Sequence, residues 1–192
     1  MNKIAKGFTL IELLIVIALL GALAVALLAA LDPLEQIKKG TDTGVRNTVS
    51  EISGSFTRYA SVKAGELPVP TGPITWQVIG ATDGTNVQTS GTDGQKAIAA
   101  AITAGELKAD FFTLAGDQLD KIYIAGVYDD TQQKVYVCFR PTAKSFLADK
   151  NTKYFYPSGT TDGVMSESST CPDNAGINTT PGSNETCYWC VQ

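Results

Sequence analysis

The chain begins with an apolar stretch that is long enough to cross a lipid bilayer. From Phe8 to Leu31 only Thr9 and Glu12 interrupt a run of apolar residues and glycine. As an α-helix these 24 residues span about 36 Å, and the hydrocarbon core of a bilayer is about 30 Å thick. Two lysines and no acid precede the run, and basic residues favour the cytoplasmic side. The pattern therefore predicts a membrane-spanning helix with its N-terminal end in the cytoplasm.

A second helical pattern begins at Asp32-Pro33-Leu34-Glu35. These residues are typical of a helix start, with an acidic cap, proline at the first helical position and glutamate at the third. Because the residue before a proline avoids the α region, we expect the first helix to kink or restart here. The less polar positions then recur in steps of three or four, at Leu34, Ile37, Thr41, Val45, Val49, Ile52, Phe56 and Tyr59.

Most charged residues of this segment, Asp42 and Arg46 among them, fall elsewhere on the helical wheel. The segment therefore predicts an amphipathic helix that runs to about Ala64 and packs on a sheet. Its three glycines each lower helix stability by up to about 1 kcal/mol relative to alanine, so the helix needs tertiary packing.

Beyond the second helix the pattern predicts a small antiparallel sheet. Residues 74–79 favour a strand, and a loop rich in Gly, Thr and Asp follows through residue 94. The Ala-rich segment 95–105 predicts a short helix. Residues 121–128 and 134–140 are rich in β-branched and aromatic side chains and flank a polar connection, which predicts a hairpin. After Pro141 the pattern indicates mostly loop.

These elements together predict an α+β fold. Its parts are a long N-terminal helix, with a transmembrane first half and an amphipathic second half, and a small antiparallel β-sheet on which the helix packs. A C-terminal tail held by disulfides completes it.

Charge and composition restrict the classes of function. The 192 residues carry a formal net charge of −4 and contain no histidine, which excludes histidine general bases and histidine metal ligands. The excess of acidic over basic residues disfavours general electrostatic binding to nucleic acid. The sequence contains no phosphate-binding lysine loop, no nucleophile elbow and no recognisable signature of paired catalytic carboxylates. We therefore predict no enzymatic activity, no cofactor, no metal site and no nucleic-acid partner.

Two further motifs are weak matches to known sites. Asp83-Gly84 and Asp93-Gly94 are similar to parts of calcium-binding loops, but their spacing fits no EF-hand, so turn residues are the preferred interpretation. Asn178 and Asn184 begin sequon-shaped tripeptides in a tail rich in Asn and Thr, where chance matches are common.

Four cysteines, Cys138, Cys171, Cys187 and Cys190, all lie beyond the membrane segment, where an oxidising compartment favours disulfides. Three connectivities are possible, and we expect Cys138 to bond with one of the other three. Cys187-Tyr188-Trp189-Cys190 matches the C-x-x-C pattern of redox sites, and four cysteines could also hold zinc. No βαβ pattern surrounds this motif, so two structural bridges are the preferred interpretation.

Glu12 is the most unusual residue of the membrane segment. An acid inside a spanning helix costs roughly 2.5–3.5 kcal/mol on insertion scales, so a functional role is the default interpretation. A plain membrane anchor explains the helix but leaves Glu12 without a role. Cleavage of an ordinary secretory signal within the Ala-rich residues 22–30 is a second alternative, and the glutamate argues against that one too.

The leader Met1-Asn2-Lys3-Ile4-Ala5-Lys6-Gly7, the aromatic Phe8 and the acid Glu12 together resemble the type III signal of the type IV pilin family. The resemblance implies that a prepilin peptidase cuts after Gly7 and methylates the new N-terminus, Phe8. It also implies that Glu12 serves filament assembly, usually by pairing with the amine of a neighbouring subunit. Cleavage leaves 13 basic against 19 acidic residues, so the net charge falls from −4 to −6.

The resemblance divides the chain into four parts. Residues 1–7 are the leader, 8–31 the transmembrane and assembly helix, 32–65 the amphipathic helix, and 66–192 the globular head with its loop-rich tail.

The implied function is that of a structural subunit of a type IV pilus, which polymerises with its own copies through the assembly machinery. The chain would be a single-pass membrane protein before assembly and part of an extracellular filament afterwards. A pseudopilin of a secretion or DNA-uptake system and a minor pilin are alternatives within the family. A membrane-tethered binding or thiol-redox module is the alternative outside it.

Overall fold

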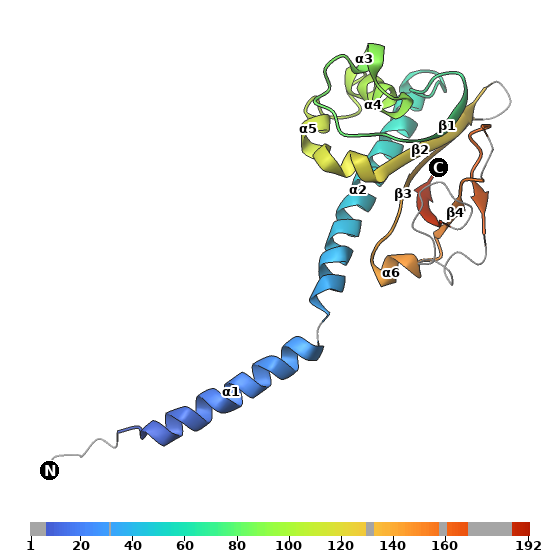
Figure 1. Ribbon diagram of the computed structural model, residues 1–192. Helices are drawn as coiled ribbons and strands as arrows, with labels where there is room; N and C mark the ends of the chain where they lie inside the picture. The colour runs from blue at the N-terminus through green and yellow to red at the C-terminus, as the bar shows by residue number, and fades with distance from the viewer. Residues whose placement is uncertain (1–6, 31, 130–132, 158–160, 169–185) are drawn as a thin grey trace. The chain divides into compact units, whose positions relative to one another are not determined.

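The computed structural model describes residues 7–30, 32–129, 133–157, 161–168 and 186–192 (Figure 1). The chain divides into two compact units, Met1–Ile37 and Lys38–Gln192.

The N-terminal unit is dominated by the helix α1, Leu10–Ala30. It runs without interruption through Gly21, because the strongly helix-forming leucines and alanines on both sides outweigh the modest cost of one glycine. Every described side chain from Phe8 to Leu28 is exposed.

The helix α2, Pro33–Val62, begins at the predicted proline. The Asp32 carboxylate accepts a hydrogen bond from the Glu35 backbone N–H at 3.2 Å, and the Asp32 carbonyl accepts one from Gln36 N–H, also at 3.2 Å. Asp32 thus satisfies two of the backbone donors that a helix start leaves without intrahelical partners.

The buried face of α2 matches the predicted apolar positions only in its central part. Val45, Val49, Ile52 and Phe56 are at most 3% exposed, as the periodicity predicts. Leu34 and Ile37, in contrast, are more than 60% exposed.

The placement of Asp42 on the polar face of this helix was wrong. Asp42 is only 3% exposed, and its carboxylate accepts hydrogen bonds from the segment that follows β3. At about 100° per residue Asp42 lies within about 20° of Val49, so its position on the wheel agrees with burial, and its charge was the misleading signal.

The described residues form one antiparallel sheet of six strands, in the order β1-β2-β3-β6-β4-β5. The strands are β1 Gly72–Val78, β2 Ile122–Tyr128, β3 Gln133–Phe139, β4 Thr152–Phe155, β5 Ser166–Glu167 and β6 Tyr188–Val191. The predicted first strand and hairpin are present as β1, β2 and β3. The α+β fold is thereby confirmed.

Most described residues after Pro141 lie outside helices and strands, as predicted, but the prediction missed four short elements. This part contains the helix α6, Lys144–Leu147, and the three strands β4, β5 and β6. None of these elements exceeds four residues, so each is too short to show a period of its own. The strand β6 forms because it pairs with both β3 and β4.

Four short helical elements complete the globular unit: α3 Val87–Ser90, α4 Asp93–Thr103, α5 Phe111–Ala115 and the 3₁₀ helix η1 Gly116–Lys121. The helix α4 corresponds to the one predicted at 95–105. It starts two residues earlier because Thr92 and Gln95 form a capping box, in which each side chain accepts from the other residue's backbone N–H.

The sheet separates two hydrophobic layers. One contains the buried face of α2, together with Ile98 of α4 and strand residues such as Ile124 and Trp189. The other is rich in tyrosine and includes Tyr136, Tyr154, Tyr156, Tyr188 and the two cysteines of a disulfide. Successive residues of β6 alternate between the layers, as the pleat of a strand requires.

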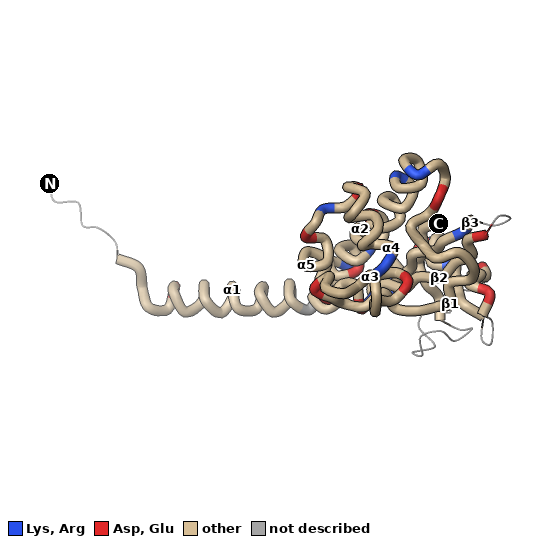
Figure 2. Tube along the Cα trace, turned by 90° about the horizontal axis from the view of Figure 1, so that it is seen from above, with Lys and Arg blue, Asp and Glu red and all other residues tan. Residues whose placement is uncertain are grey.

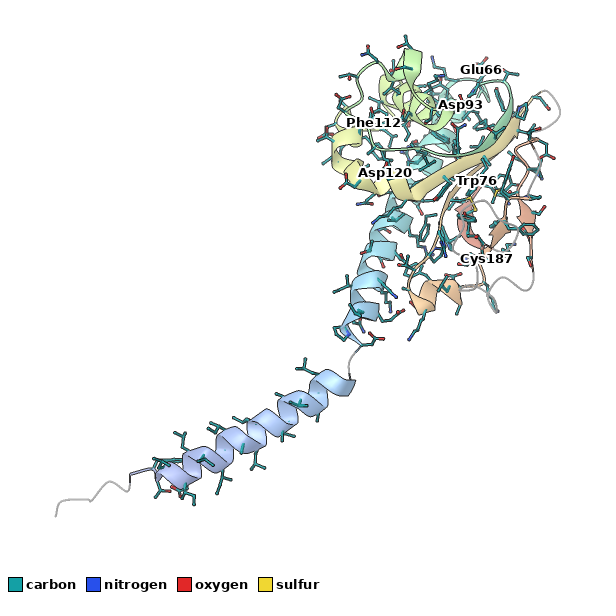
Figure 3. All side chains as sticks on the ribbon, in the orientation of Figure 1. Glu66, Trp76, Asp93, Phe112, Asp120 and Cys187 are labelled. Atoms are coloured by element: carbon teal, nitrogen blue, oxygen red, sulfur yellow. A yellow bond between two sulfur atoms is a disulfide. The ribbon has the colours of Figure 1, made fainter. Side chains whose placement is uncertain are left out.

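Trp76, labelled in Figure 3, extends the second layer to the first strand. It stacks on Tyr123 with ring centroids 4.8 Å apart and planes 5° from parallel. The pairing of β1 with β2 shifts by one residue between Ile74 and Gln77, so a bulge lies beside Trp76.

Candidate processing and assembly site

The first turn of α1 is closed by a reciprocal pair of side chains, Thr9 and Glu12. Thr9 precedes the first helical residue, and its hydroxyl oxygen accepts a hydrogen bond from the Glu12 backbone N–H at 3.3 Å. In return, Glu12 Oε2 accepts from the Thr9 backbone N–H at 2.8 Å and from the Thr9 hydroxyl at 2.7 Å. This arrangement is a capping box.

The capping box gives Glu12 a local role that the sequence analysis missed. Thr9-Leu10-Ile11-Glu12 fits the S/T-x-x-E pattern before an apolar run, so the signal was present in the sequence. The acid supplies an acceptor to N–H and O–H groups that α1 itself cannot satisfy. Part of the cost of placing a carboxylate at this depth is offset by these bonds.

The carboxylate of Glu12 retains one oxygen for another partner. All its hydrogen bonds to described residues use Oε2, and Oε1 has no partner among them. Because an ionised carboxylate has about four acceptor positions on two oxygens, Oε1 is available to an additional donor. Phe8, the residue that the sequence analysis predicts as the new N-terminus, is 78% exposed.

The apolar residues of α1 meet the requirements of a membrane span. Within the described part of the chain, the segment Leu10–Leu28 is the one helix that is long and apolar enough to cross a bilayer. At 1.5 Å per residue, the full helix of 21 residues is about 32 Å long.

A comparison with protein families identifies this same region. The family model of the prokaryotic N-terminal methylation motif matches residues 2–28. The chain carries a type IV prepilin-like signal. Gly7, Phe8 and Glu12 all lie inside the matched region. No curated protein and no solved structure gives a significant match to the chain.

The structure pairs two of the four candidate cysteines with each other. Cys138 of β3 and Cys190 of β6 are direct neighbours in the antiparallel register and form a disulfide. Cys187, labelled in Figure 3, is also disulfide-bonded. Cys171 lies outside the described residues. The two cysteines of the C-x-x-C motif are therefore not bonded to each other, and that motif does not form a redox disulfide.

The calcium-like motifs have structural roles. Asp83 accepts hydrogen bonds from the Thr85 backbone N–H at 2.8 Å and the Thr85 hydroxyl at 2.7 Å, and these two bonds lower the pKa of its carboxyl. Asp93 lies in the first turn of α4 and accepts from Gln77 Nε2 at 3.1 Å. Within the described ranges, no group of three or more potential metal ligands occurs. Asn178 and Asn184 lie outside those ranges.

The charged residues of the globular unit are dispersed. Figure 2 shows basic and acidic positions intermixed over it. Among the described residues, the shortest ion pair joins Lys153 Nζ to Glu167 Oε2 at 2.8 Å, between β4 and β5. The hydrogen bond from Lys153 lowers the pKa of Glu167, and the same bond raises the pKa of Lys153.

Proposed function

We propose that this protein is a structural subunit of a type IV pilus-like filament. It is made as a membrane-anchored precursor, cut between Gly7 and Phe8 by a prepilin peptidase, and methylated on the Phe8 amine. The observation that carries the proposal is the methylation motif at residues 2–28 together with the capped acid at the third position of α1. The proposed role is structural and not enzymatic.

The chemistry of the N-terminal segment supports polymerisation through α1. Cleavage converts the Phe8 peptide nitrogen into an α-amine, a class of group that is mostly protonated at neutral pH. Glu12 offers Oε1 as an acceptor one helical turn away, or to the amine of an adjacent copy. A pair between two copies fixes the register of their helices, although desolvation limits its net energy.

The exposed surface of α1 supports the same role. An apolar helix whose described side chains are all exposed needs lipid or other helices around it. The membrane provides lipid before assembly, and helices of neighbouring copies replace it in a filament core. This exchange needs no soluble intermediate.

The test is to locate the chain and identify its N-terminus in the same strain. Mature protein recovered from sheared surface filaments should begin at N-methylated Phe8, and antibodies to the globular unit should label the filaments along their length. Gly7→Val should keep the precursor in the membrane fraction with Met1 or Asn2 at its N-terminus. Gly21→Ala is the matched control, since a Cβ at Gly21 would meet no atom within 4 Å.

Three results distinguish the alternatives. Correct processing with label restricted to filament tips indicates a minor pilin. Correct processing without surface filaments indicates a pseudopilin. Unprocessed protein in the membrane, or cleavage within residues 22–30, contradicts the proposal.

A further inference from the structure

In the globular unit, the Arg46 side chain covers two aromatic rings. The Arg46 Cζ atom is 4.8 Å from the centroid of the Trp189 ring and 5.7 Å from that of Phe146. Trp189 comes from β6, Phe146 from α6 and Arg46 from α2. Stacking on aromatic faces fixes the guanidinium plane and leaves its N–H edges for other partners.

The indole N–H of Trp189 has no hydrogen-bond partner among the described residues. Trp189 is only 5% exposed. In the described part of the chain, its Nε1 is the one buried side-chain nitrogen or oxygen atom without a hydrogen-bond partner. Buried polar groups are nearly always bonded, because an unpaired one costs about 1–3 kcal/mol. This donor is therefore expected to have a partner that the isolated chain does not supply.

Arg46 also has no acceptor within the chain as described. Asp42 lies one turn earlier on the same helix face, but its oxygens are taken by Thr142 N–H at 2.7 Å, Ala143 N–H at 2.7 Å and the Thr142 hydroxyl at 2.9 Å. Among the described residues, no carboxylate lies within 4.0 Å of Arg46, and none accepts a hydrogen bond from it. The five guanidinium N–H donors are thus unused.

We propose that Arg46 and Trp189 form a binding site for a carboxylate group. A carboxylate only accepts hydrogen bonds, and its two oxygens match the fork of an arginine. One oxygen also satisfies the indole N–H beside the guanidinium. A neutral carbonyl satisfies the indole but leaves the positive charge of the partly buried Arg46 without a counter-ion.

The carboxylate has two possible sources. It is either an acidic side chain of a second copy, which rests on the proposed filament function, or a free organic acid. After cleavage the chain carries 19 acidic residues against 13 basic ones, so a neighbouring copy has more carboxylates than basic side chains to pair with them. Since Nε1 is covered in the isolated chain, binding includes a shift of the partly exposed Arg46 side chain that lies over the ring.

The experiment follows the indole N–H signals of full-length, ¹⁵N-labelled protein in detergent micelles while sodium acetate is added at constant ionic strength. The chain has two tryptophans, and Trp76→Phe assigns their signals. The Trp189 signal should shift downfield and saturate with acetate, and it should not respond to chloride. Arg46→Met should weaken acetate binding at least about tenfold. Trp189→Phe removes the indole signal, so its acetate binding is followed through the Phe146 ring signals, and it should be weaker by about threefold to tenfold.

Arg58→Met is the matched control. Arg58 lies on the same helix but already pairs with Glu51 and Glu106, so its loss should leave acetate binding unchanged. An unchanged Trp189 signal at saturating acetate, both in micelles and in assembled filaments, overturns the proposal. A shift that Arg58→Met abolishes as fully as Arg46→Met also overturns it.

Assembled filaments distinguish the sources. A Trp189 signal already shifted in filaments without acetate supports a carboxylate from a second copy, and a signal that shifts only on acetate addition supports a free acid. If the protein never forms filaments but the micelle titration succeeds, the filament function fails while the carboxylate site stands.

Discussion

The carboxylate of Asp42 accepts a hydrogen bond from the backbone N–H of Thr142 at 2.7 Å, across 100 positions of the chain. A second bond of equal length comes from Ala143 N–H, whose residue is fully buried. Asp42 thus fastens α2 to the segment between β3 and α6. The packing of the helix on the sheet depends on this one acid as well as on its apolar stripe.

Replacing Asp42 should destabilise the globular unit. Asp42→Ala leaves the buried Ala143 N–H without an acceptor and removes two further bonds, so we expect a loss of about 2–4 kcal/mol in the free energy of unfolding. Denaturant titration followed by tryptophan fluorescence measures this. Asp117→Ala, at an exposed position, is the control and should change the same free energy by less than about 0.5 kcal/mol. Equal changes in the free energy of unfolding for the two substitutions would contradict the role of Asp42 in fastening α2.

The two roles of Glu12 can be separated by substitution. Glutamine can replace glutamate in a capping box, so Glu12→Gln should keep the start of α1 intact while removing the charge. We expect unchanged or improved membrane insertion and strongly reduced incorporation into filaments. Filament counts and membrane fractionation measure these effects.

Thr9→Ala is the complementary variant. It removes the cap at a cost of about 1 kcal/mol in helix stability but leaves the charge of Glu12, so filaments should still form. Glu12→Ala removes the charge and the carboxylate half of the box, while the Thr9 hydroxyl still accepts from the backbone N–H of residue 12, so this variant should be at least as defective as Glu12→Gln. If Thr9→Ala abolishes filaments while Glu12→Gln does not, the cap and not the charge is the assembly determinant.

Breaking the Cys138–Cys190 bridge should release β6. The bridge spans 52 positions, for which the chain-entropy model gives about 4 kcal/mol of stabilisation. Cys138→Ser should therefore expose Trp189 and make the C-terminal part of the head sensitive to protease, while α1 still inserts into membranes. Limited proteolysis with mass spectrometry detects this, and a tail as resistant as wild type contradicts it.

Peptide mapping under non-reducing conditions should identify the second bridge. Cys187 is oxidised and Cys138 is bonded to Cys190, so Cys171 is the one cysteine left in the sequence to pair with Cys187. A Cys187–Cys190 peptide in native protein would instead restore the redox interpretation of the C-x-x-C motif.

The edge of the sheet should loosen in acid. The pKa of Glu167 is lowered in the folded protein, chiefly by the hydrogen bond from Lys153. A lowered folded-state pKa means that the stabilisation is complete above the ordinary glutamate range and is lost as the pH falls through the lowered value. The Ser168 N–H bonds to the Lys153 carbonyl at 2.8 Å, and its protection factor, which is the exchange rate corrected for the intrinsic effect of pH, should fall on acidification. Glu167→Gln should remove this pH dependence.

The parts of the fold that could be predicted are those with local signals. The stripe from Val45 to Phe56 repeats over three turns, and β2 and β3 are each seven residues of strand-forming composition. The methylation signal is equally local. Each of these patterns is long enough to be recognised without its tertiary partners.

The parts that were missed depend on contacts between distant residues. The carboxylate of Asp42 can be buried because Thr142 and Ala143 donate hydrogen bonds to it. The segment β6 is a strand because it pairs with both β3 and β4. The box of Thr9 and Glu12 is the exception, since its pattern was visible in the sequence. The cost of an acid in a membrane indicates a functional partner but does not reveal that Thr9, three positions earlier, supplies a local one.

The position of β6 has a consequence for the order of events during synthesis. This strand follows every other described strand in the chain, yet it lies between β3 and β4 in the sheet. Strands β1–β3 and the pair β4–β5 therefore become one sheet only when Tyr188–Val191, which is made after them, pairs with both β3 and β4. A product that stops before this point lacks the strand that joins the two parts and the Cys190 thiol that bonds with Cys138, so a chain must extend to Val191 to form the continuous sheet.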